Sequence, residues 1–338
     1  MKLLPLIDQF NRPLHDLRIS VTDRCNFRCR YCMPREVFGP RYHYLRQQEL
    51  LTFEEITRIA SLFSGLGVTK IRLTGGEPLL RRDLDVLVHM LSSVSGIVDV
   101  AMTTNGALLA AQADALRKAG LNRVTVSLDA IDEVIFQQMN DAEFSAARVL
   151  QGINTAAKVG LSPIKVNMVV QRGVNDCEVL ALAEQFRHTP VVLRFIEYMD
   201  VGNTNNWKLP EVVPSAEIVE IISQRWALEP VQPRYFGEVA SRYTYKDGAG
   251  EIGVISSVTA PFCGSCTRAR LSSDGKLFTC LFGSDGVDLR TLVRGDGTDD
   301  DLRSLISSVW TRRSDKYSET RSAEGSSQKK VEMSRIGG

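Results

Sequence analysis

The sequence lacks the features that would assign it to a membrane, to the cell exterior or to a nucleic acid. No apolar run reaches the ~18 residues of a membrane-spanning helix. The first residues, Met1 to Asp8, have neither the apolar stretch nor the small-residue cleavage site of a secretory signal. The charges nearly cancel, since 41 Lys and Arg face 40 Asp and Glu. We therefore expect a cytoplasmic protein without a membrane or nucleic-acid partner, in which local groups of Arg and Lys meet any anionic ligand.

The cysteines number seven, and an odd number cannot all be paired. In the reducing cytoplasm, cysteines are more often metal ligands or buried thiols than disulfides. Two groups of three and a spare residue, Cys177, describe the pattern best. The composition is otherwise ordinary, with 43% hydrophobic residues, and 338 residues suffice for one large or two medium domains.

The first two-thirds of the chain alternates short apolar segments with helical ones. The helix after Thr52 begins with a capping box that Glu55 completes, and glycines such as Gly120 and Gly160 mark helix ends. Six strand–helix units in a row predict a parallel α/β sheet, either an incomplete barrel or a doubly wound open sheet. The predicted strands are Asp16–Val21, Thr69–Thr74, Val98–Thr103, Arg123–Leu128, Ile164–Val170 and Val191–Ile196.

Polar residues follow five of the six predicted strands, at the ends where both arrangements bind ligands. These segments are Thr22–Arg24, Thr74–Pro78, Thr103–Gly106, Ser127–Asp129 and Glu197–Met199.

After about Leu228 the alternation stops, which predicts one unit over 1–228 and a C-terminal region over 229–338. Residues 234–260 indicate short β-segments with Gly-rich turns. The polar residues 311–332 indicate an exposed helix or a loose tail.

Cys25, Cys29 and Cys32 form a C-x3-C-x2-C segment with Tyr31 before the last thiol. Three soft ligands are one fewer than a cubic iron–sulfur cluster needs, so one metal position is left for a ligand that is not protein. Structural zinc is the alternative, and it would need a fourth ligand, for which His43 is the only candidate nearby in sequence.

Cys263, Cys266 and Cys280 form a second group of three. This group could hold zinc, a cluster with an open iron, or a cluster closed by a distant ligand such as Cys177, which we interpret as a buried thiol at a helix start. On a strand, the side chains of Arg268 and Arg270 would share one face and suit a phosphate. Two solvated surface charges are the alternative.

The first cysteine segment resembles the signature of the radical S-adenosylmethionine (SAM) enzymes. Gly75-Gly76-Glu77-Pro78 matches the GGEP motif of that family. The resemblance implies that three thiolates hold a 4Fe–4S cluster and that SAM chelates the fourth iron through its amino and carboxylate groups. It also implies that the GGEP turn holds the amino group, although Gly-Gly-Glu-Pro alone would indicate only a tight turn.

Both cysteine groups, the Arg-x-Arg after Cys266 and the Gly-Gly end are similar to the GTP 3′,8-cyclase family of molybdenum cofactor biosynthesis. The match runs from about Leu14 to Gly338, and only the loop 35–38 departs from the family pattern. The resemblance implies an incomplete (β/α)6 TIM-like barrel, closed by a C-terminal region that carries a second 4Fe–4S cluster. The matching segments are 16–25, 72–78, 165–169, 194–199 and 263–271.

The resemblance also implies roles for individual residues, and the cofactors rather than a side chain carry the radical chemistry. A cation in an apolar strand, such as Lys165 or Arg194, independently indicates a polar cavity, because burying it unpaired is costly. SAM contacts are implied for Tyr31, Gly76, Glu77, Ser127 and Met199. GTP contacts are implied for Arg18, Lys70, Arg72, Thr103, Lys165, Arg194, Arg268, Ala269 and Arg270, with Gly337 and Gly338 as a tail that reaches the active site.

The implied reaction converts GTP to (8S)-3′,8-cyclo-7,8-dihydroguanosine 5′-triphosphate. A 5′-deoxyadenosyl radical from SAM abstracts the hydrogen at C3′, and the C3′ radical then adds to C8 of guanine. The implied partners are an electron donor of the flavodoxin or ferredoxin type and a downstream cyclic pyranopterin monophosphate synthase. The resemblance is also compatible with a homodimer.

Two other functions remain open at this point. A peptide-modifying radical enzyme would usually carry more C-terminal cysteines. A zinc-stabilised nucleic-acid-binding protein is disfavoured by the isoelectric point of about 7.6.

Overall fold

The structure is a computed structural model that describes residues 6–141, 143–321 and 329–338. Within these residues twelve strands form one sheet, in the order β12-β11-β10-β1-β2-β3-β4-β5-β6-β9-β8-β7. All six predicted strands are confirmed, each to within one residue at either end. They are β1 (Asp16–Ser20), β2 (Lys70–Thr74), β3 (Asp99–Thr104), β4 (Arg123–Ser127), β5 (Lys165–Val170) and β6 (Val192–Glu197).

The order of these six strands decides between the two predicted arrangements. Each strand pairs in parallel with the next one along the chain. A doubly wound sheet reverses its strand order partway, whereas β1 to β6 follow one another without a reversal. The fold is therefore the incomplete barrel, in which side chains from successive strands face one common interior.

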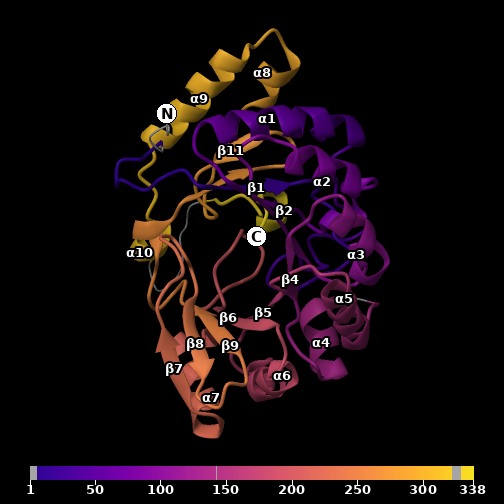
Figure 1. Cartoon of the computed structure of the whole chain (residues 1–338), viewed down its shortest axis with the longest axis vertical. Coiled ribbons are helices and arrows are strands. Elements are labelled where there is room, and N and C mark those ends of the chain that lie inside the picture. Colours follow the sequence, from indigo (N-terminus) through magenta and orange to yellow (C-terminus); the bar gives the residue numbers. More distant parts are fainter. Residues whose placement is uncertain (1–5, 142, 322–328) are drawn as a thin grey trace.

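Helices cover the outer side of this curved sheet (Figure 1). The capping box at Thr52 is confirmed, because its hydroxyl accepts a bond from the Glu55 N–H at 3.2 Å and the Glu55 carboxylate accepts one from Thr52 N–H at 2.8 Å. The helices between the first and seventh strands are α1 (Phe53–Gly65), α2 (Leu84–Ser92), α3 (Leu109–Lys118), α4 (Glu133–Asn140), α5 (Ala146–Lys158), α6 (Val179–Phe186) and α7 (Ser215–Arg225).

The C-terminal region extends both edges of the six-stranded core. β10 (Arg268–Leu271) pairs in parallel with β1, and β9 (Glu251–Ile255) pairs in parallel with β6. This region therefore supplies the neighbours that β1 and β6 would have in a complete barrel, as expected. The remaining strands, all antiparallel to their neighbours, are β7 (Leu228–Val231), β8 (Ser241–Tyr245), β11 (Lys276–Phe278) and β12 (Val287–Asp288).

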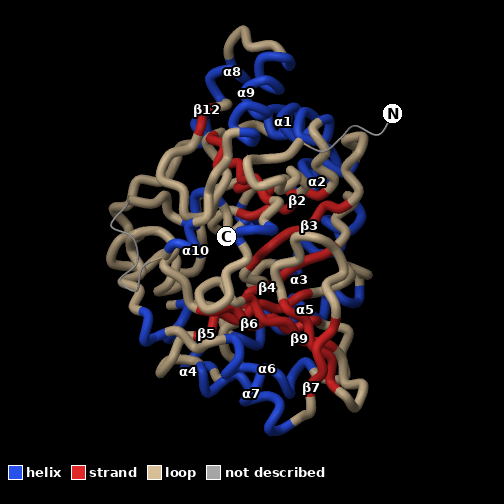
Figure 2. Tube along the Cα trace, turned by 90° about the vertical axis from the view of Figure 1, so that its left-hand side faces the viewer, coloured by secondary structure: helices blue, strands red, loops and turns tan. Residues whose placement is uncertain are grey.

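The end of the chain returns to the middle of the molecule, as the position of the C-terminus in Figures 1 and 2 shows. The prediction of an exposed helix or a loose tail over 311–332 is confirmed only in part, because Arg312, Glu319 and Lys329 are exposed whereas the side chains of Arg313 and Lys330 are buried. Residues 322–328 of that prediction lie outside the described residues. The last helices are α8 (Arg290–Arg294), α9 (Asp299–Thr311), α10 (Tyr317–Thr320) and α11 (Met333–Ile336).

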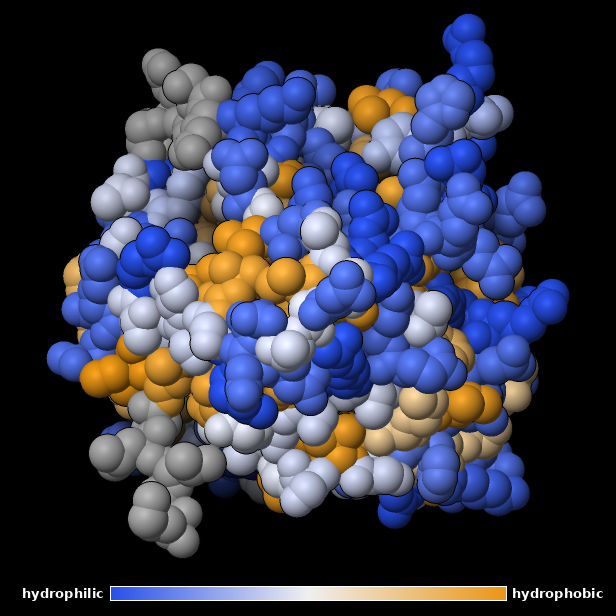
Figure 3. Space-filling model, turned by 90° about the horizontal axis from the view of Figure 1, so that it is seen from above, coloured by the Kyte–Doolittle hydropathy of each residue, from blue (hydrophilic) through white to orange (hydrophobic). Residues whose placement is uncertain are grey.

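The outer surface above α1 and α9 is mostly hydrophilic, with apolar side chains gathered in small groups (Figure 3). Among the helices of the described residues, none has the length and apolar character needed to cross a membrane.

Candidate active site

One cavity of about 320 Å³ lies inside the incomplete barrel, a size typical of ligand sites. All six cysteines of the two predicted groups line it. Ligands were expected at the carboxyl ends of the strands, and residues at those ends, such as Gly76, Thr104 and Asp129, do line the cavity. It also runs inward along the barrel interior as far as Lys70 and Lys165, the first residues of β2 and β5.

The first cysteine segment is a loop after β1, held in place by Arg28 and by Phe27. The guanidinium of Arg28 donates to the carbonyl oxygens of Cys25 and Phe27, both at 2.7 Å, and to that of Phe38 at 2.9 Å. Phe27 is buried and stacks on Phe144 at 6.0 Å between ring centroids. The loop is thus fixed by bonds to its backbone, which leaves its three sulfur atoms directed to the cavity.

Gly76 lies against this loop, where no side chain would fit. A Cβ atom there would collide with the carbonyl of Arg24, and the Gly76 N–H donates to Thr22 O at 2.8 Å. Glu77 is buried, and its carboxylate accepts bonds from the Leu79 N–H at 3.0 Å, the Thr104 hydroxyl at 2.7 Å and the Asn105 N–H at 2.7 Å. Glu77 therefore joins the turn after β2 to the turn after β3, in addition to lining the cavity.

Tyr31 contacts Asp129, the last residue of the polar segment Ser127–Asp129, to which the sequence analysis gave no role of its own. Its hydroxyl donates to Asp129 Oδ2 at 2.9 Å, and Asp129 also accepts the Val169 N–H at 2.9 Å. Burial raises the pKa of Asp129 to about 6 and that of Glu77 to about 7. The first cysteine loop thus faces two buried carboxyl groups.

The thiols of this loop are themselves buried. Burial, with the negative charge of Glu77 next, raises the pKa of Cys25 to about 12, and burial also raises the pKa values of Cys29 and Cys32. Such sulfurs become thiolates only beside a cation, and bound iron supplies that charge.

The second cysteine loop is held by two buried arginines. Arg12 donates to the Cys263 carbonyl at 2.9 Å, and Arg313 donates to the Cys266 carbonyl at 2.7 Å. Asp8 lies between the two guanidiniums, 2.5 Å from Arg12 Nε and 3.4 Å from Arg313. The N-terminal segment and the segment after α9 thus meet beneath the second loop.

The electrostatic surroundings of Cys266 differ from those of the first loop. Burial by itself would raise the pKa of Cys266, but the charges of Arg268 and Arg313 outweigh that effect and lower it to about 6. The guanidinium of Arg268 donates to the Cys266 sulfur from Nε at 3.4 Å and from a terminal nitrogen at 3.2 Å. Burial still raises the pKa of Cys280, to about 11.

The strand register places three arginines side by side on the cavity wall. Arg18 of β1 pairs with Arg270 of β10 on one side and with Arg72 of β2 on the other. Like charges directly opposite each other destabilise a sheet. Burial, with the charges of Arg270, Arg268 and Arg72, lowers the pKa of Arg18 well below its ordinary value. In the part of the chain that the structure describes, no ion pair includes any of the three arginines of this row.

The neighbouring row differs because it contains an acid. Asp16 pairs in register with Arg268 and with Lys70, and the Lys70 Nζ lies 2.9 Å from an oxygen of Asp16. This row is therefore partly neutralised, whereas the row Arg270–Arg18–Arg72 is not.

Two further cations line the cavity from β5 and β6. Burial, with Arg194 next, lowers the pKa of Lys165 to about 7, and burial, with Arg72 next, lowers that of Arg194 to about 9. Arg194 Nε donates to Asn167 Oδ1 at 3.0 Å, and Arg72 donates to Thr103 and Thr125, both at 3.1 Å. The expectation that cations on these apolar strands face a polar cavity is thus met by their positions.

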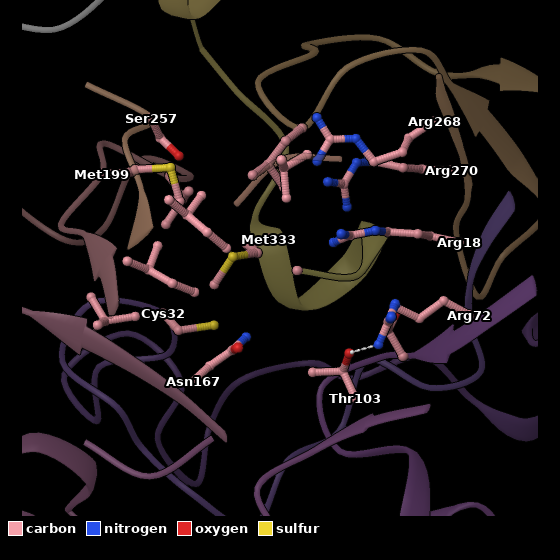
Figure 4. A pocket seen from close by; sticks show the side chains of 18 of the residues that line it. Arg18, Cys32, Arg72, Thr103, Asn167, Met199, Ser257, Arg268, Arg270 and Met333 are labelled. Carbon is pink, nitrogen blue, oxygen red and sulfur yellow. Dashed lines mark hydrogen bonds between the residues drawn. The ribbon is translucent and has the colours of Figure 1, made fainter. Parts of the chain in front are cut away.

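The last residues of the chain enter the same cavity. Met333 and Gly338 line it, and the carbonyl of Gly337 accepts a bond from Arg270. Gly337 has φ = 77°, and a side chain there would collide with Thr74, so glycine is required. Figure 4 shows Met333 between two facing groups: Arg18, Arg72, Arg268 and Arg270 on one side, and Cys32, Met199 and Ser257 on the other.

Some residues singled out in the sequence lie elsewhere. The side chain of Ala269 is in the apolar core, because it points away from the face that Arg268 and Arg270 share. Our interpretation of Cys177 as a buried thiol is wrong, since the residue is exposed. His43 lines a separate, more open pocket formed by the loop 35–43, and no cysteine lines that pocket. The other residues implied for SAM and GTP line the cavity.

The donor set fits iron–sulfur clusters better than single ions. Each loop presents three sulfur atoms to one cavity, and the buried thiols of the first loop need a cation to ionise. Among the described residues, no three Cys, His, Asp or Glu side chains converge on one ion-sized position.

The chain is similar to known proteins along nearly its whole length. Residues 19–186 match the family model of the Radical SAM superfamily, and residues 191–319 match that of Molybdenum Cofactor Synthesis C. The GTP 3′,8-cyclase of Acidothermus cellulolyticus is 53% identical, with 99% of each chain covered. The GTP 3′,8-cyclase of Staphylococcus aureus strain JH9 is 48% identical, with 98% of each chain covered.

Solved structures with the same fold are more distant in sequence. Streptococcus suis SuiB bound to S-adenosylmethionine gives a TM-score of 0.60 at 14% identity, over 89% of this chain and 69% of that chain. SuiB bound to its precursor peptide SuiA gives 0.61 at 15% identity, over 89% and 68%. These likenesses show the fold, and the identity of nearly half or more to the cyclases shows the family. The chain belongs to the GTP 3′,8-cyclase family of the radical SAM superfamily.

Proposed function

We propose that this protein converts GTP to (8S)-3′,8-cyclo-7,8-dihydroguanosine 5′-triphosphate, the first step of molybdenum cofactor biosynthesis. The observation that carries the proposal is the unneutralised row Arg270–Arg18–Arg72, which shares one cavity with both cysteine loops. Buried cations without acidic partners are stable only when an anion or water meets them. A triphosphate is such an anion, and the planar fork of arginine matches its oxygens.

The first loop would hold one 4Fe–4S cluster through Cys25, Cys29 and Cys32, with SAM on the open iron. When bound and reduced, this cluster supplies the electron that splits SAM into methionine and a 5′-deoxyadenosyl radical. Gly76 would let the backbone approach the amino group of SAM, because a side chain there is excluded. Glu77 keeps this turn in place through its three hydrogen bonds. The remaining SAM contacts would be Tyr31, Ser127 and Met199.

The second loop would hold a second 4Fe–4S cluster through Cys263, Cys266 and Cys280, with an open iron for the guanine base. Arg268 contacts the Cys266 sulfur, so its guanidinium would lie beside this cluster. The row of arginines, with Lys165 and Arg194, would bind the phosphates. Lys70 would contribute less, because Asp16 already neutralises it.

The protein's own task is to bind both substrates in a single enclosed space. Fixing two reactants in one geometry removes most of the entropic cost of their meeting. The apolar residues around the cavity and the C-terminal tail within it keep water from the radical. A flavodoxin- or ferredoxin-type protein would supply the electron, and a cyclic pyranopterin monophosphate synthase would use the product.

The test incubates the anaerobically reconstituted, reduced protein with SAM, with and without GTP. We expect about eight irons per chain, as two clusters require, and formation of 5′-deoxyadenosine together with a cyclised nucleotide when GTP is present. ATP in place of GTP is the matched control and should give no cyclised nucleotide. If GTP yields no cyclised nucleotide from a protein with full iron content, the proposal fails.

A further inference from the structure

A group of buried charges joins the end of the chain to the segment after β6. Asp200 lies at the centre, and only 5% of its surface is exposed. The Lys330 Nζ donates to its carboxylate at 2.6 Å and to its carbonyl at 2.7 Å, and the Arg321 Nε lies 2.7 Å from its other carboxylate oxygen. The Tyr317 hydroxyl also donates to Asp200. We call these four residues the Asp200 cluster.

A second set of bonds follows immediately along the same two segments. The Lys330 N–H donates to Asn203 Oδ1 at 2.9 Å, and the amide side chain of Asn203 donates back to the Lys330 carbonyl. The Glu332 carboxylate accepts the Asn203 N–H at 3.0 Å and the Thr204 hydroxyl at 3.3 Å. Gly202 has φ = 63°, and a Cβ atom there would collide with the Glu332 carboxylate. The two segments therefore fit closely over residues 202–204 and 330–332.

The cluster is adjacent to the cavity at both of its ends. On one side, Met199 and Val201, which flank Asp200, line the cavity. On the other side, only five residues lie between Glu332 and Gly338, which also lines the cavity. Because this segment is short, fixing its start at Lys330 and Glu332 strongly restricts where Gly337 and Gly338 can lie.

In the Asp200 cluster one buried carboxylate pairs with two cations, Lys330 and Arg321. Asp200 is the shared partner of both cations, so without it Lys330 and Arg321 would be uncompensated buried charges, which is strongly unfavourable. Lys330 and Tyr317 donate hydrogen bonds to Asp200, whereas Arg321 meets the other carboxylate oxygen as an ion pair without a hydrogen bond. The apolar environment strengthens the pairing, because Tyr317 stacks on Phe282 at 4.3 Å and Lys330 lies 4.6 Å from the Tyr317 ring centre.

We propose that the Asp200 cluster is a clasp that holds the C-terminal Gly-Gly tail in the cavity and fixes it to the Met199 segment. Asp200 and Lys330 are then positioning residues for cyclisation, since they act through the tail and not on substrate. This proposal rests on the proposed function, because it assumes that the tail acts with Arg270 at the GTP end of the cavity.

The main variant is Lys330→Met, which keeps the length of the side chain and leaves Arg321 and Tyr317 on Asp200. We expect ~10-fold slower formation of cyclised nucleotide, with more 5′-deoxyadenosine per cyclised product and with unchanged iron content. Lys330→Arg, which keeps the charge, should restore most of the activity. The matched control is Arg242→Gln, which removes a buried arginine paired with Glu251 on a neighbouring strand away from the tail, and it should leave cyclisation unchanged.

A double-variant comparison separates a clasp from a general structural role. Deleting Gly337 and Gly338 should lower cyclisation on its own. If Lys330 acts through the tail, adding Lys330→Met to the deletion should reduce the rate no further than ~2-fold, because residues of one unit are not additive. If the two reductions multiply, the clasp proposal is overturned.

Amide hydrogen exchange needs no turnover, so it tests the clasp independently of the proposed function. The amides of Arg335 and Gly337 are bonded to the carbonyls of Glu332 and Met333. We expect their hydrogen exchange to be ~10-fold faster in Lys330→Met and unchanged in Arg242→Gln. Unchanged exchange in Lys330→Met would overturn the clasp even in an active cyclase. Faster exchange in a protein that fails to cyclise GTP would support the clasp and refute the proposed function.

Discussion

The two cysteine loops line one cavity with the same ligands, three sulfur atoms each, in opposite electrostatic surroundings. The first loop faces the buried carboxyl groups of Glu77 and Asp129, and burial, with the charge of Glu77 next, raises the pKa of Cys25 to about 12. The second loop is bordered by Arg268 and Arg313, and the pKa of Cys266 is lowered to about 6. The difference comes from the residues around each loop and not from the loops themselves.

We propose that this contrast assigns different ligands to the two ends of the cavity. SAM carries a sulfonium and an ammonium group, and a site with buried carboxyl groups favours cations. GTP carries a triphosphate, and the row Arg270–Arg18–Arg72 favours anions. On this proposal, the neighbouring charges distinguish two cysteine loops of similar composition.

Removing one cysteine from each loop is expected to have the largest effect. Cys32→Ser should abolish both 5′-deoxyadenosine formation and cyclisation, whereas Cys280→Ser should spare SAM binding and abolish only cyclisation. Each variant should retain about four irons per chain, because one cluster remains. Full cyclase activity in Cys280→Ser would contradict the assignment of the second cluster.

The two rows of cations can be compared by the variants Arg18→Met and Lys70→Met. Arg18→Met should raise the KM for GTP by ~10- to 100-fold, as loss of a charged hydrogen bond of about 1.5–3 kcal/mol requires. Its melting temperature should stay the same or rise, because the change relieves repulsion among buried arginines. Lys70→Met should lower the melting temperature, because it leaves the buried Asp16 without its lysine. If Arg18→Met raises the KM for GTP less than Lys70→Met does, our proposal that the row Arg270–Arg18–Arg72 contributes more to GTP binding is wrong.

A smaller effect is expected from pH, which changes the charge of Lys165 without a mutation. Burial lowers the pKa of Lys165 to about 7, so this lysine is charged below pH 7 and loses its charge as the pH rises through that value. We expect kcat/KM for GTP to fall by up to ~10-fold between pH 6.5 and 8.5, since this parameter reports groups of the free enzyme. In Lys165→Arg the charge persists, so the ratio of wild-type to variant kcat/KM should fall over this range. A ratio that does not change with pH would show that Lys165 keeps its charge in the free enzyme.

The smallest effect is expected at the seventh cysteine. Cys177 is exposed and lies apart from both loops, so Cys177→Ser should change neither the iron content nor the rate of cyclisation. It is the matched control for Cys280→Ser, because the chemical change is the same. A loss of iron in Cys177→Ser would mean that a cluster has a fourth protein ligand.

Local sequence signals were reliable where a single segment carries the information. The six strands of the barrel, the capping box at Thr52 and the shared face of Arg268 and Arg270 all depend on residues close together in the chain. The errors arose where burial depends on distant segments. Cys177 is exposed although cysteines are usually buried, and Arg313 and Lys330 are buried in a segment whose composition predicts exposure. The pairing of Tyr31 with Asp129 had no signal in the sequence, because the two residues are far apart in the chain.

The sequence by itself determined which residues are the candidate ligands of the clusters and of SAM, since the spacing of cysteines within each loop and the GGEP turn are local features. Only the tertiary structure decided which charges remain unneutralised. β10 pairs with β1 although some 250 residues separate them, and that register aligns Arg270 with Arg18 and Arg268 with Asp16. A shift by one residue would turn the arginines to the other face of the strand, because side chains alternate along it. The long-range pairing of strands, which no local pattern encodes, therefore sets the field that separates the two ends of the cavity.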